Sequence, residues 1–261
     1  MDSAEIKELV RSRYGSIAAA SASCCAPATT SCCSPEHAKS ARMGYTEDEL
    51  QAVPEGANLG LGCGNPQAIA ALQPGEVLID LGSGAGFDCL LAARQVGPEG
   101  RVIGVDMTHE MLAKARDNAA RVGAANVEFR LGEIEYLPIP DNTGDVIISN
   151  CVINLVPDKA RVFREAFRVL KPGGRLAISD VVNIAPLPAE LASDKALLCG
   201  CVAGAAPSAA IEDWLRSAGF TDISIQVKPE SRDYVATWAA GRGIENYVAS
   251  ANIEARKPMA R

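Results

Sequence analysis

The stretch EVLIDLGSGAGFD, residues 76–88, decides the fold, because in it an apolar run ends at Asp80 and gives way to three alternating glycines. Leu and Ala at helical spacing follow, so the stretch predicts a strand, a tight turn and a helix. Gly82, Gly84 and Gly86 can take positive φ angles and let a ligand lie against main-chain N–H groups. We therefore expect a ligand site here, although such a turn can also serve only to join a strand to a helix.

The spacing of these glycines differs from the dinucleotide-binding fingerprint, in which the third glycine falls one place later. The carboxylate of Asp80, two places before the first glycine, could reach the ammonium group of an amino-acid-like ligand directly or through water. The stretch resembles the first motif of the class I S-adenosylmethionine-dependent methyltransferases.

Composition and charge restrict the function further. The chain has 261 residues, 48% of them hydrophobic, which is enough for one well-buried α/β domain with appendages or for two small domains. Charged residues interrupt every apolar window, and the N-terminus lacks the apolar centre of a secretory signal. We expect a cytoplasmic protein without a membrane segment, and a monomer, because no apolar surface repeat is evident. The net charge of −7, with Lys and Arg scattered, disfavours nucleic acid as a partner.

The chain has nine cysteines, a number that needs an explanation, and in a reducing compartment they should be free thiols. The adjacent pairs Cys24-Cys25 and Cys32-Cys33 fall in a low-complexity run of Ala, Ser, Thr, Pro and Cys, for which we expect a mobile arm. Adjacent cysteines with a single His37 match the spacing of a zinc site poorly. Two interpretations stay open for the pairs: capture or relay of a thiophilic species, or no role.

The core of the chain alternates strands with helices, which predicts a mostly parallel sheet with helices on both faces. The pattern predicts strands at 76–81, 101–106, 127–131, 145–150 and 174–182, and helices at 86–96, 109–122 and 158–169. In such sheets ligands bind at the carboxyl ends of the strands, so the residues that follow each strand are the candidates for a site.

Three segments are predicted from the changes in pattern. Residues 1–60 would hold an N-terminal helix and the Cys-rich arm, residues 61–182 the ligand-binding core, and residues 183–261 a C-terminal segment that completes the sheet at an antiparallel edge. Within the last segment we expect a helix from Ser208 to a stop at Gly219, a strand near 221–228 and a final strand close to the C-terminus.

Acidic residues follow the second and third predicted strands. Asp106 could accept both ribose hydroxyls of an adenosine, and Met107 could cover the adenine face. The alternative for Asp106 is a cap for the next helix. After the third strand, Glu133 could bind the adenine amino group and the backbone of Ile134 a ring nitrogen, although exposed loop glutamates are often only solvated.

Thiols stand at two further places in the pattern. Cys151 follows Asn150 at the end of the fourth strand, and Cys63 lies between two glycines in a loop that can be neither helix nor regular strand. Cys151 could be a small buried hydrophobe, and Cys63 a chance thiol in a turn. Their places at a strand end and in a loop that can approach the site favour a function.

Six motifs together resemble the arsenite methyltransferases of bacteria and archaea: LGLGCGNP, DLGSGAGFD, GVDMT, LGEIE, SNCVINLVPDK and LKPGGRLAISDVV. The likeness runs from about Tyr45 to Phe220 and includes the final strand. It implies the class I methyltransferase fold, which is Rossmann-like. In that family three cysteines bind trivalent arsenic, and these match Cys63, Cys151 and Cys201, whereas Cys199 matches less well.

The resemblance also implies S-adenosylmethionine as the methyl donor. The residues implied for its site are Asp80, Gly82, Ser83, Gly84, Gly86, Asp106, Met107, Glu133, Ile134 and Asn150.

The chemistry suits these residue types, because trivalent arsenic is soft and prefers thiolate ligands. Its lone pair is the nucleophile, so no general base is needed. Since arsenic is oxidised as it gains a methyl group, the family is expected to use a thiol reductant such as thioredoxin or glutathione, with Cys63 and another cysteine supplying electrons. The sequence leaves open the number of methyl groups, the final product, the reductant and the acceptance of antimony or selenium.

Two other classes stay possible on the residues alone. One is a methyltransferase for a small metabolite, in which the cysteines are merely buried. The other is a thiol sensor or arsenic-sequestering protein without enzymatic activity, which the predicted donor site argues against.

Overall fold

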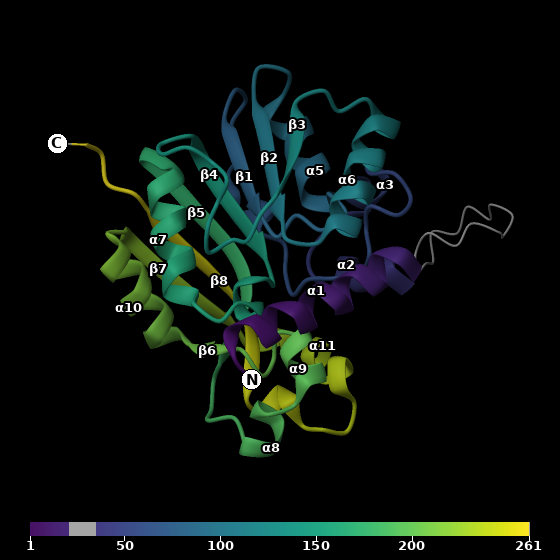
Figure 1. Cartoon of the computed structure of the whole chain (residues 1–261), viewed down its shortest axis with the longest axis vertical. Helices are drawn as coiled ribbons and strands as arrows, with labels where there is room; N and C mark the ends of the chain where they lie inside the picture. Colours follow the sequence, from purple (N-terminus) through teal and green to yellow (C-terminus); the bar gives the residue numbers. More distant parts are fainter. Residues whose placement is uncertain (21–34, 261) are drawn as a thin grey trace, which may run out of the picture.

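A computed structural model describes residues 1–20 and 35–260, so Cys24, Cys25, Cys32 and Cys33 lie outside the described residues. The chain forms one sheet in the order β3-β2-β1-β4-β5-β8-β7, with β6 paired to the end of β5 (Figure 1). The strands are β1 (Val77–Leu81), β2 (Arg101–Asp106), β3 (Val127–Leu131), β4 (Gly144–Asn150), β5 (Leu170–Asn183), β6 (Ala206–Pro207), β7 (Thr221–Lys228) and β8 (Val248–Arg256).

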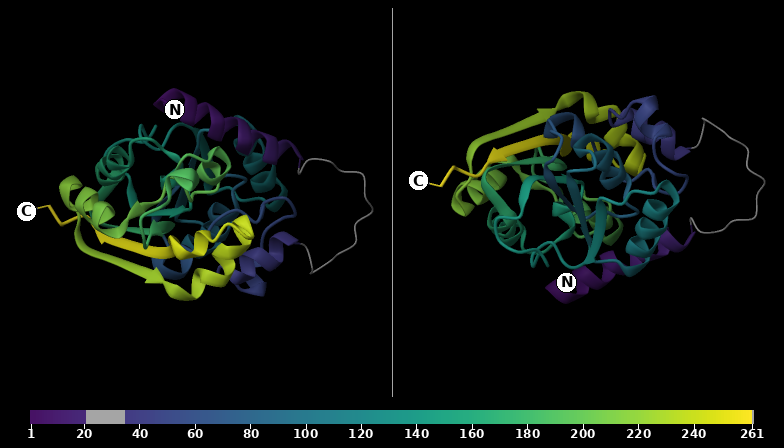
Figure 2. Two further views of the ribbon diagram at one scale, coloured as in Figure 1. Left: turned by 90° about the horizontal axis from the view of Figure 1, so that it is seen from below. Right: turned by 90° about the horizontal axis from the view of Figure 1, so that it is seen from above.

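The directions of the strands confirm the predicted mixed sheet. Strands β1 to β5 run parallel to their neighbours, whereas β8 runs antiparallel to both β5 and β7. The antiparallel strand is therefore second from the edge, and β7 forms the edge itself. Figure 2 shows the pair β7 and β8 on one side of the molecule and the N-terminal helix on the opposite side.

The helices occupy the connections between strands and the two ends of the chain. The α-helices are α1 (Ser3–Ala20), α2 (Pro35–Arg42), α3 (Glu47–Gln51), α4 (Gln67–Ala70), α5 (Phe87–Val96), α6 (His109–Val122), α7 (Lys159–Val169), α8 (Ala189–Ala192), α9 (Lys195–Cys199), α10 (Ser208–Ala218) and α11 (Arg232–Ala236). Single turns of 3₁₀ helix are η1 (Ile153–Leu155), η2 (Pro229–Ser231), η3 (Thr237–Ala239) and η4 (Ile244–Asn246). Among the described residues, every helix is too short or too polar to traverse a lipid bilayer.

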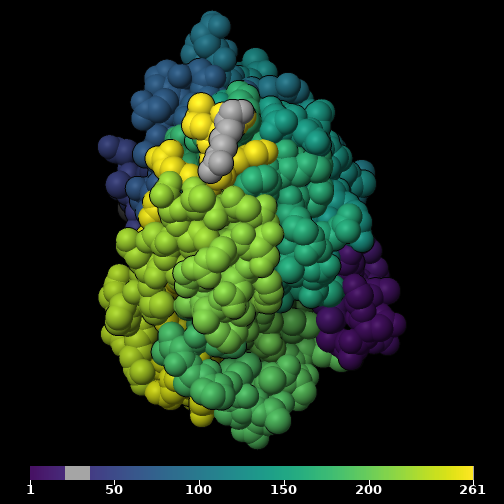
Figure 3. Space-filling view, turned by 90° about the vertical axis from the view of Figure 1, so that its left-hand side faces the viewer, coloured from purple at the N-terminus to yellow at the C-terminus, as the bar shows by residue number. Residues whose placement is uncertain are grey.

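Alternation along the strands builds a core on each face of the sheet, because successive side chains point to opposite faces. Ile79 and Leu81 of β1 join a cluster with Phe163 of α7 and Leu215 of α10. Leu78, which precedes Ile79 and points to the opposite face, belongs to a second cluster, which α5 and α6 complete. Figure 3 shows the side that α7 and α10 cover, with the N-terminal helix at its margin in purple.

The N-terminal helix α1 lies across the carboxyl ends of the parallel strands and contacts α6, α9 and η1 (Figure 1). Its Val10 is buried, and Tyr14 packs beside it against a cluster that contains the three cysteines of interest. This helix therefore covers the end of the sheet at which ligands of parallel α/β folds bind.

Candidate functional site

A cavity of about 670 Å³ lies at the carboxyl ends of β1, β2 and β4, under α1. Most of the residues that the sequence predicted for the site are among its lining residues: Asp80, Gly82, Ser83, Gly84, Asp106, Met107, Ile134, Asn150, Cys151 and Cys201. Three predicted residues, Cys63, Gly86 and Glu133, are not among its lining residues. The topology thus brings together residues that are far apart in the chain, such as Asp80 and Cys201, which are separated by 121 positions.

The glycine turn after β1 is shaped to admit a ligand. Gly82, Gly84 and Gly86 all have positive φ, at 76°, 51° and 89°. A Cβ on Gly82 would lie 2.4 Å from the side chain of Val152, whereas a Cβ on Gly84 would meet no atom within 4 Å. Ser83 has a buried hydroxyl without a hydrogen-bond partner among the described residues. Open space beside one glycine and an unpaired hydroxyl fit a polar ligand lying along this turn.

Two carboxylates lie buried at the start of the turn. Asp80 accepts a hydrogen bond from the thiol of Cys89 at 3.2 Å, and Asp88 accepts one from the hydroxyl of Tyr45 at 2.7 Å. Burial raises the pKa of both carboxyls, and the charge of Asp88 raises the pKa of Asp80 further. A cation in the cavity would favour their ionised forms, as the prediction for Asp80 requires. Asp88 was missed, although it stands in the same stretch two places after the third glycine.

Asp106 ends β2 and holds the turn from the other side. Its carboxylate accepts the N–H groups of Gly84 at 2.9 Å and of Thr108 at 2.8 Å. Burial raises the pKa of this carboxyl, whereas these backbone hydrogen bonds lower it. Asp106 therefore lies between the glycine turn and the start of α6, and its role at a ribose stays a prediction.

Glu133 is placed differently from its neighbours. It forms ion pairs with Lys7 at 2.6 Å and with Arg11 at 3.6 Å, both on α1. Its side chain lines an adjacent groove of about 800 Å³ between α1 and α6. The main cavity is lined instead by Glu135, which pairs with Lys7 at 3.2 Å. The sequence pattern could not predict that Glu133 pairs with α1, because nothing in it indicates that α1 contacts this loop.

Three thiols converge at the other end of the cavity. Cys63, Cys151 and Cys201 are all buried, with 3%, 8% and 2% of their surfaces exposed. The pKa of the Cys151 thiol is raised well above its ordinary value. The largest cause is its hydrogen bond with Cys201, followed by that with Cys63 and by burial. The Cys201 thiol also donates to the Cys151 carbonyl at 2.8 Å. Cys151 is thus the central member of the three.

Asn150 fixes the loop that carries Cys63. Its amide oxygen accepts the N–H of Cys63 at 3.0 Å, and its amide nitrogen donates to the Gly64 carbonyl at 2.8 Å. Ser250 of β8 donates to the Cys63 carbonyl at 2.7 Å. A Cβ on Gly62 would lie 2.8 Å from the Asn150 side chain, so only glycine lets the loop approach this closely. Asn150 therefore connects the end of β4 to the first thiol.

Unusual backbone conformations occur at two of the thiols. Cys151 has φ of 59° and Cys201 has φ of 62°, in the left-handed region that residues other than glycine seldom adopt. The N–H of Cys151 donates to the Ser179 carbonyl at 2.8 Å, which helps to hold the turn. Strained backbone of this kind gathers at functional sites, where the surrounding structure enforces it.

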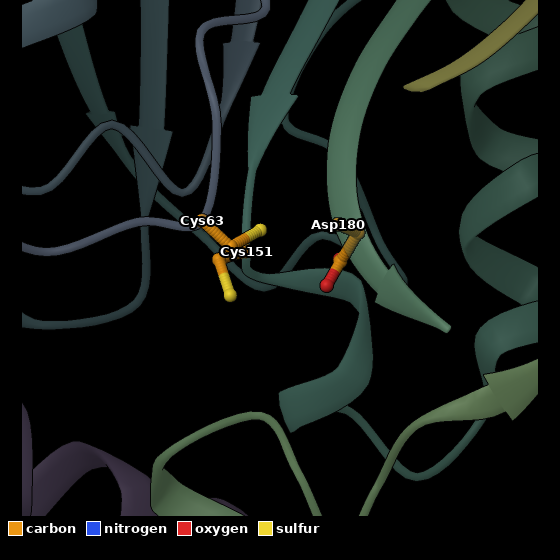
Figure 4. A group of neighbouring side chains, drawn as sticks. All are labelled: Cys63, Cys151 and Asp180. Carbon is orange, nitrogen blue, oxygen red and sulfur yellow. The ribbon is translucent and has the colours of Figure 1, made fainter. Parts of the chain in front are cut away.

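Asp180 of β5 is a site residue that the sequence interpretation missed. Its carboxylate oxygen and the sulfurs of Cys63 and Cys151 all lie within 4.8 Å of one another (Figure 4). Asp180 accepts the N–H of Ile153 at 3.0 Å, and burial raises its pKa to about 6. The signal was an acidic residue near the carboxyl end of the fifth predicted strand, in ISDVV.

Comparisons with known proteins show what the chain is similar to. The family model described as a methyltransferase domain matches residues 72–222. An arsenite methyltransferase of Halobacterium salinarum is 52% identical over 98% of this chain and 68% of its own length. One of Aquipseudomonas alcaligenes is 48% identical over 66% of this chain and 51% of its own length.

A solved structure is similar over most of the chain. It is an arsenic(III) S-adenosylmethionine methyltransferase of Chlamydomonas reinhardtii, with a TM-score of 0.62 and 35% identity. The similarity covers 87% of this chain and 75% of that one.

Proposed function

Because the chain belongs to the arsenite methyltransferase family, we propose that it moves methyl groups from S-adenosylmethionine to trivalent arsenic held by Cys63, Cys151 and Cys201. The products are methylated arsenicals and S-adenosylhomocysteine, and the reaction serves arsenic detoxification. The observation that carries the proposal is the convergence of three buried thiols beside a cavity whose other end is the glycine turn. A cavity of about 670 Å³ also lies within the usual range for a bound small molecule.

The donor site is proposed to use residues from both sides of the glycine turn. S-adenosylmethionine, when bound, supplies a methyl group on a positively charged sulfur. Asp80 would face its ammonium group and Asp106 its ribose. The open space beside Gly84 would let the donor lie against the main chain of the glycine turn. A contact of Glu133 with the adenine amino group would replace its ion pair with Lys7.

The acceptor site is proposed to bind arsenite by exchange of its hydroxyls for thiolates. Each thiol forms one As–S bond and gives its proton to the hydroxide that leaves as water. Burial raises the pKa of the Cys63 thiol, and Cys151 and Cys201 also have raised pKa values. The thiols are therefore protonated near neutral pH and can supply those protons. Three sulfurs leave the arsenic lone pair as the nucleophile, so positioning and exclusion of water account for the catalysis.

The methyl transfer takes two electrons from arsenic, which the thiols are proposed to return. Two thiolates, one of them Cys63, would form a disulfide as arsenic regains its trivalent state. An external thiol reductant, thioredoxin or glutathione, would then reduce the disulfide. This part of the proposal fails if Cys63→Ser methylates methylarsenite at the native rate and no disulfide forms after one turnover.

We also propose that residues 183–261 act as the arsenic-binding segment, residues 61–182 as the donor-binding core and residues 1–60 as an N-terminal helix with a Cys-rich arm. The chain is proposed to act as a monomer. Light scattering on the purified protein in the presence of both substrates tests this, and a stable dimer would contradict it.

The experiment that tests the function is incubation of the reduced protein with arsenite, S-adenosylmethionine and a thiol, with separation of the arsenic species over time. We expect methylated arsenicals from the native protein and none from Cys151→Ser or Asp80→Ala. Asp80→Ala should still bind arsenite, and Cys151→Ser should still bind S-adenosylmethionine, which separates the two halves of the site. Methylation of a small metabolite in place of arsenite would support the alternative acceptor class.

A further inference from the structure

We propose that Cys63, Cys151 and Asp180 form a second donor set, overlapping the first, that binds a thiophilic divalent cation such as Zn²⁺. The two sets share Cys63 and Cys151 and differ in their third member. That the cation competes with arsenite rests on the proposed function, whereas the cation site itself does not.

The geometry of the three side chains suits a tetrahedral ion. They come from the loop before α4, the turn after β4 and the strand β5, and Figure 4 shows them gathered at the end of the sheet. All three are buried, and their ligand atoms lie within 4.8 Å of one another. Zinc holds sulfur at about 2.3 Å and oxygen at about 2.1 Å, so its ligand atoms are roughly 3.5–3.8 Å apart. Movement of the ligand atoms toward one another by about 1.3 Å or less completes the set.

The turn after β4 orients the carboxylate of Asp180. Oδ1 accepts the side chain of Asn154 at 2.9 Å and the N–H of Val181 at 2.7 Å, and Oδ2 accepts the N–H of Ile153 at 3.0 Å. The backbone N–H of Asn154 also acts on this carboxylate. A carboxylate offers about four acceptor positions, so an ion would bind in place of the Asn154 N–H. The other three hydrogen bonds hold the carboxylate in place, as supporting partners do for metal ligands.

The third member of each donor set determines whether that set prefers arsenic or zinc. Trivalent arsenic is soft and takes three thiolates in a pyramid, which requires Cys201. Zinc accepts carboxylate oxygen beside thiolate and keeps a fourth position for water or another ligand, which requires Asp180 and leaves Cys201 unused. An ion in the second set would hold Cys63 and Cys151 and so exclude arsenite.

Reciprocal variants test this division. The experiment uses the full chain with Cys24, Cys25, Cys32 and Cys33 changed to serine, so that the arm contributes no thiols. Binding of Zn²⁺ is measured by competition with a chromophoric chelator, and binding of arsenite by equilibrium dialysis. We expect Asp180→Asn to weaken Zn²⁺ binding by about tenfold or more and arsenite binding by less than about twofold. Cys201→Ser should do the reverse, and the matched control Cys199→Ser should change neither.

A measurement on the unsubstituted Asp180 protein decides the matter even if Asp180→Asn fails to fold. X-ray absorption of the Zn²⁺-loaded chain should show two sulfur neighbours with the remaining neighbours oxygen. Three sulfurs, or equal Zn²⁺ affinity in folded Asp180→Asn and its parent, would overturn the proposal. Because neither readout involves methyl transfer, an absence of arsenite methylation would count against the proposed function alone. With both proposals correct, Zn²⁺ slows methylation and a chelator restores it.

Discussion

Single glycines in the turn after β1 have different tasks, although all three have positive φ. Gly82 is needed for packing, because a Cβ would lie 2.4 Å from Val152. A Cβ on Gly84 would meet no atom within 4 Å, and Gly84 lines the cavity. The sequence shows three equivalent glycines, and the structure separates the one that faces the ligand from the one that lets two chain segments meet.

Replacement of Gly84 should therefore affect binding more than folding. We expect Gly84→Ala to lose about 1 kcal/mol of stability from its positive φ, and to bind S-adenosylmethionine at least tenfold more weakly because the methyl group enters the cavity. Gly123→Ala is the matched control, with φ of 65° in the left-handed region, no atom within 4 Å of its Cβ, and a place outside the cavity. Chemical denaturation and calorimetric titration measure the two effects, and equal donor affinity in both variants would contradict the expectation.

Among the elements, α7 shows how a helix can hold a loop of the site. Glu165 accepts the N–H of Leu137 at 2.8 Å, and Arg168 donates to Glu165 at 2.7 Å and to the Leu137 carbonyl at 3.1 Å. Leu137 stands three places after Ile134, which lines the cavity. The last turns of α7 thus fix the loop between β3 and β4.

Stability should depend on pH through this contact. The hydrogen bond from Arg168 lowers the pKa of Glu165 in the folded chain. A lowered carboxyl pKa stabilises the fold above the unfolded pKa of about 4.3, and this contribution is lost as pH falls through the folded value. We expect Glu165→Gln to cost about 1 kcal/mol at pH 7, a figure discounted for partial exposure, and little at pH 3.

The control for this measurement is Glu212→Gln on α10, whose ion pair with Arg216 is largely exposed. It should change the free energy of unfolding by less than about 0.5 kcal/mol at either pH. A Glu165→Gln deficit that is the same at pH 7 and pH 3 would show that packing, and not ionisation, is responsible.

Elements were predictable from sequence where local signals were strong. Helix α6 has its predicted bounds because Thr108 precedes it and Gly123 ends it at φ of 65°. Helix α1, predicted at the N-terminus, extends to Ala20, since the alanines near its end favour helix. The short helices α8, α9 and α11 were not predicted, because segments of four or five residues have no periodicity to detect.

The site shows the same division. Residues at or just after the end of a strand, such as Asp106 and Cys151, could be predicted because parallel topology places strand ends together. Asp180 lies inside a strand that continues to Asn183, so its nearness to Cys63 depends on how β4 and β5 pair. Glu133 was assigned without knowledge that α1 returns to the same edge, which is a contact over more than 120 residues.

For the molecule as a whole, α1 is the part that separates the thiols from solvent. Val10 is buried among the residues that surround Cys63, Cys151 and Cys201, and Tyr14 packs beside it. Lys7 fastens the helix to Glu133 and Glu135 across the end of the sheet. Access to the thiols should therefore depend on an ion pair near the other end of the cavity.

Loss of that fastening should make the thiols more reactive. We expect Lys7→Met to raise the alkylation rate of Cys201 about fivefold or more, which corresponds to an ion-pair contribution of roughly 1 kcal/mol to the closed position of α1. Mass spectrometry of iodoacetamide-treated protein measures the rate at each cysteine. Glu8→Gln, at an exposed position of the same helix, should leave the rates unchanged. Equal rates in both variants would mean that α1 does not control access.

The left-handed backbone at Cys151 and Cys201 affects which residues evolution should retain at these two positions. Glycine at either position would relieve roughly 1 kcal/mol of backbone strain and lose the packing of a buried side chain, two effects of similar size, so stability alone gives little reason to keep cysteine there. A library randomised at both codons and passed through thermal challenge should accept glycine beside cysteine, and the same library grown with arsenite should retain cysteine. In organisms that are not exposed to arsenite, we expect the first inactivating substitutions to accumulate at these two codons.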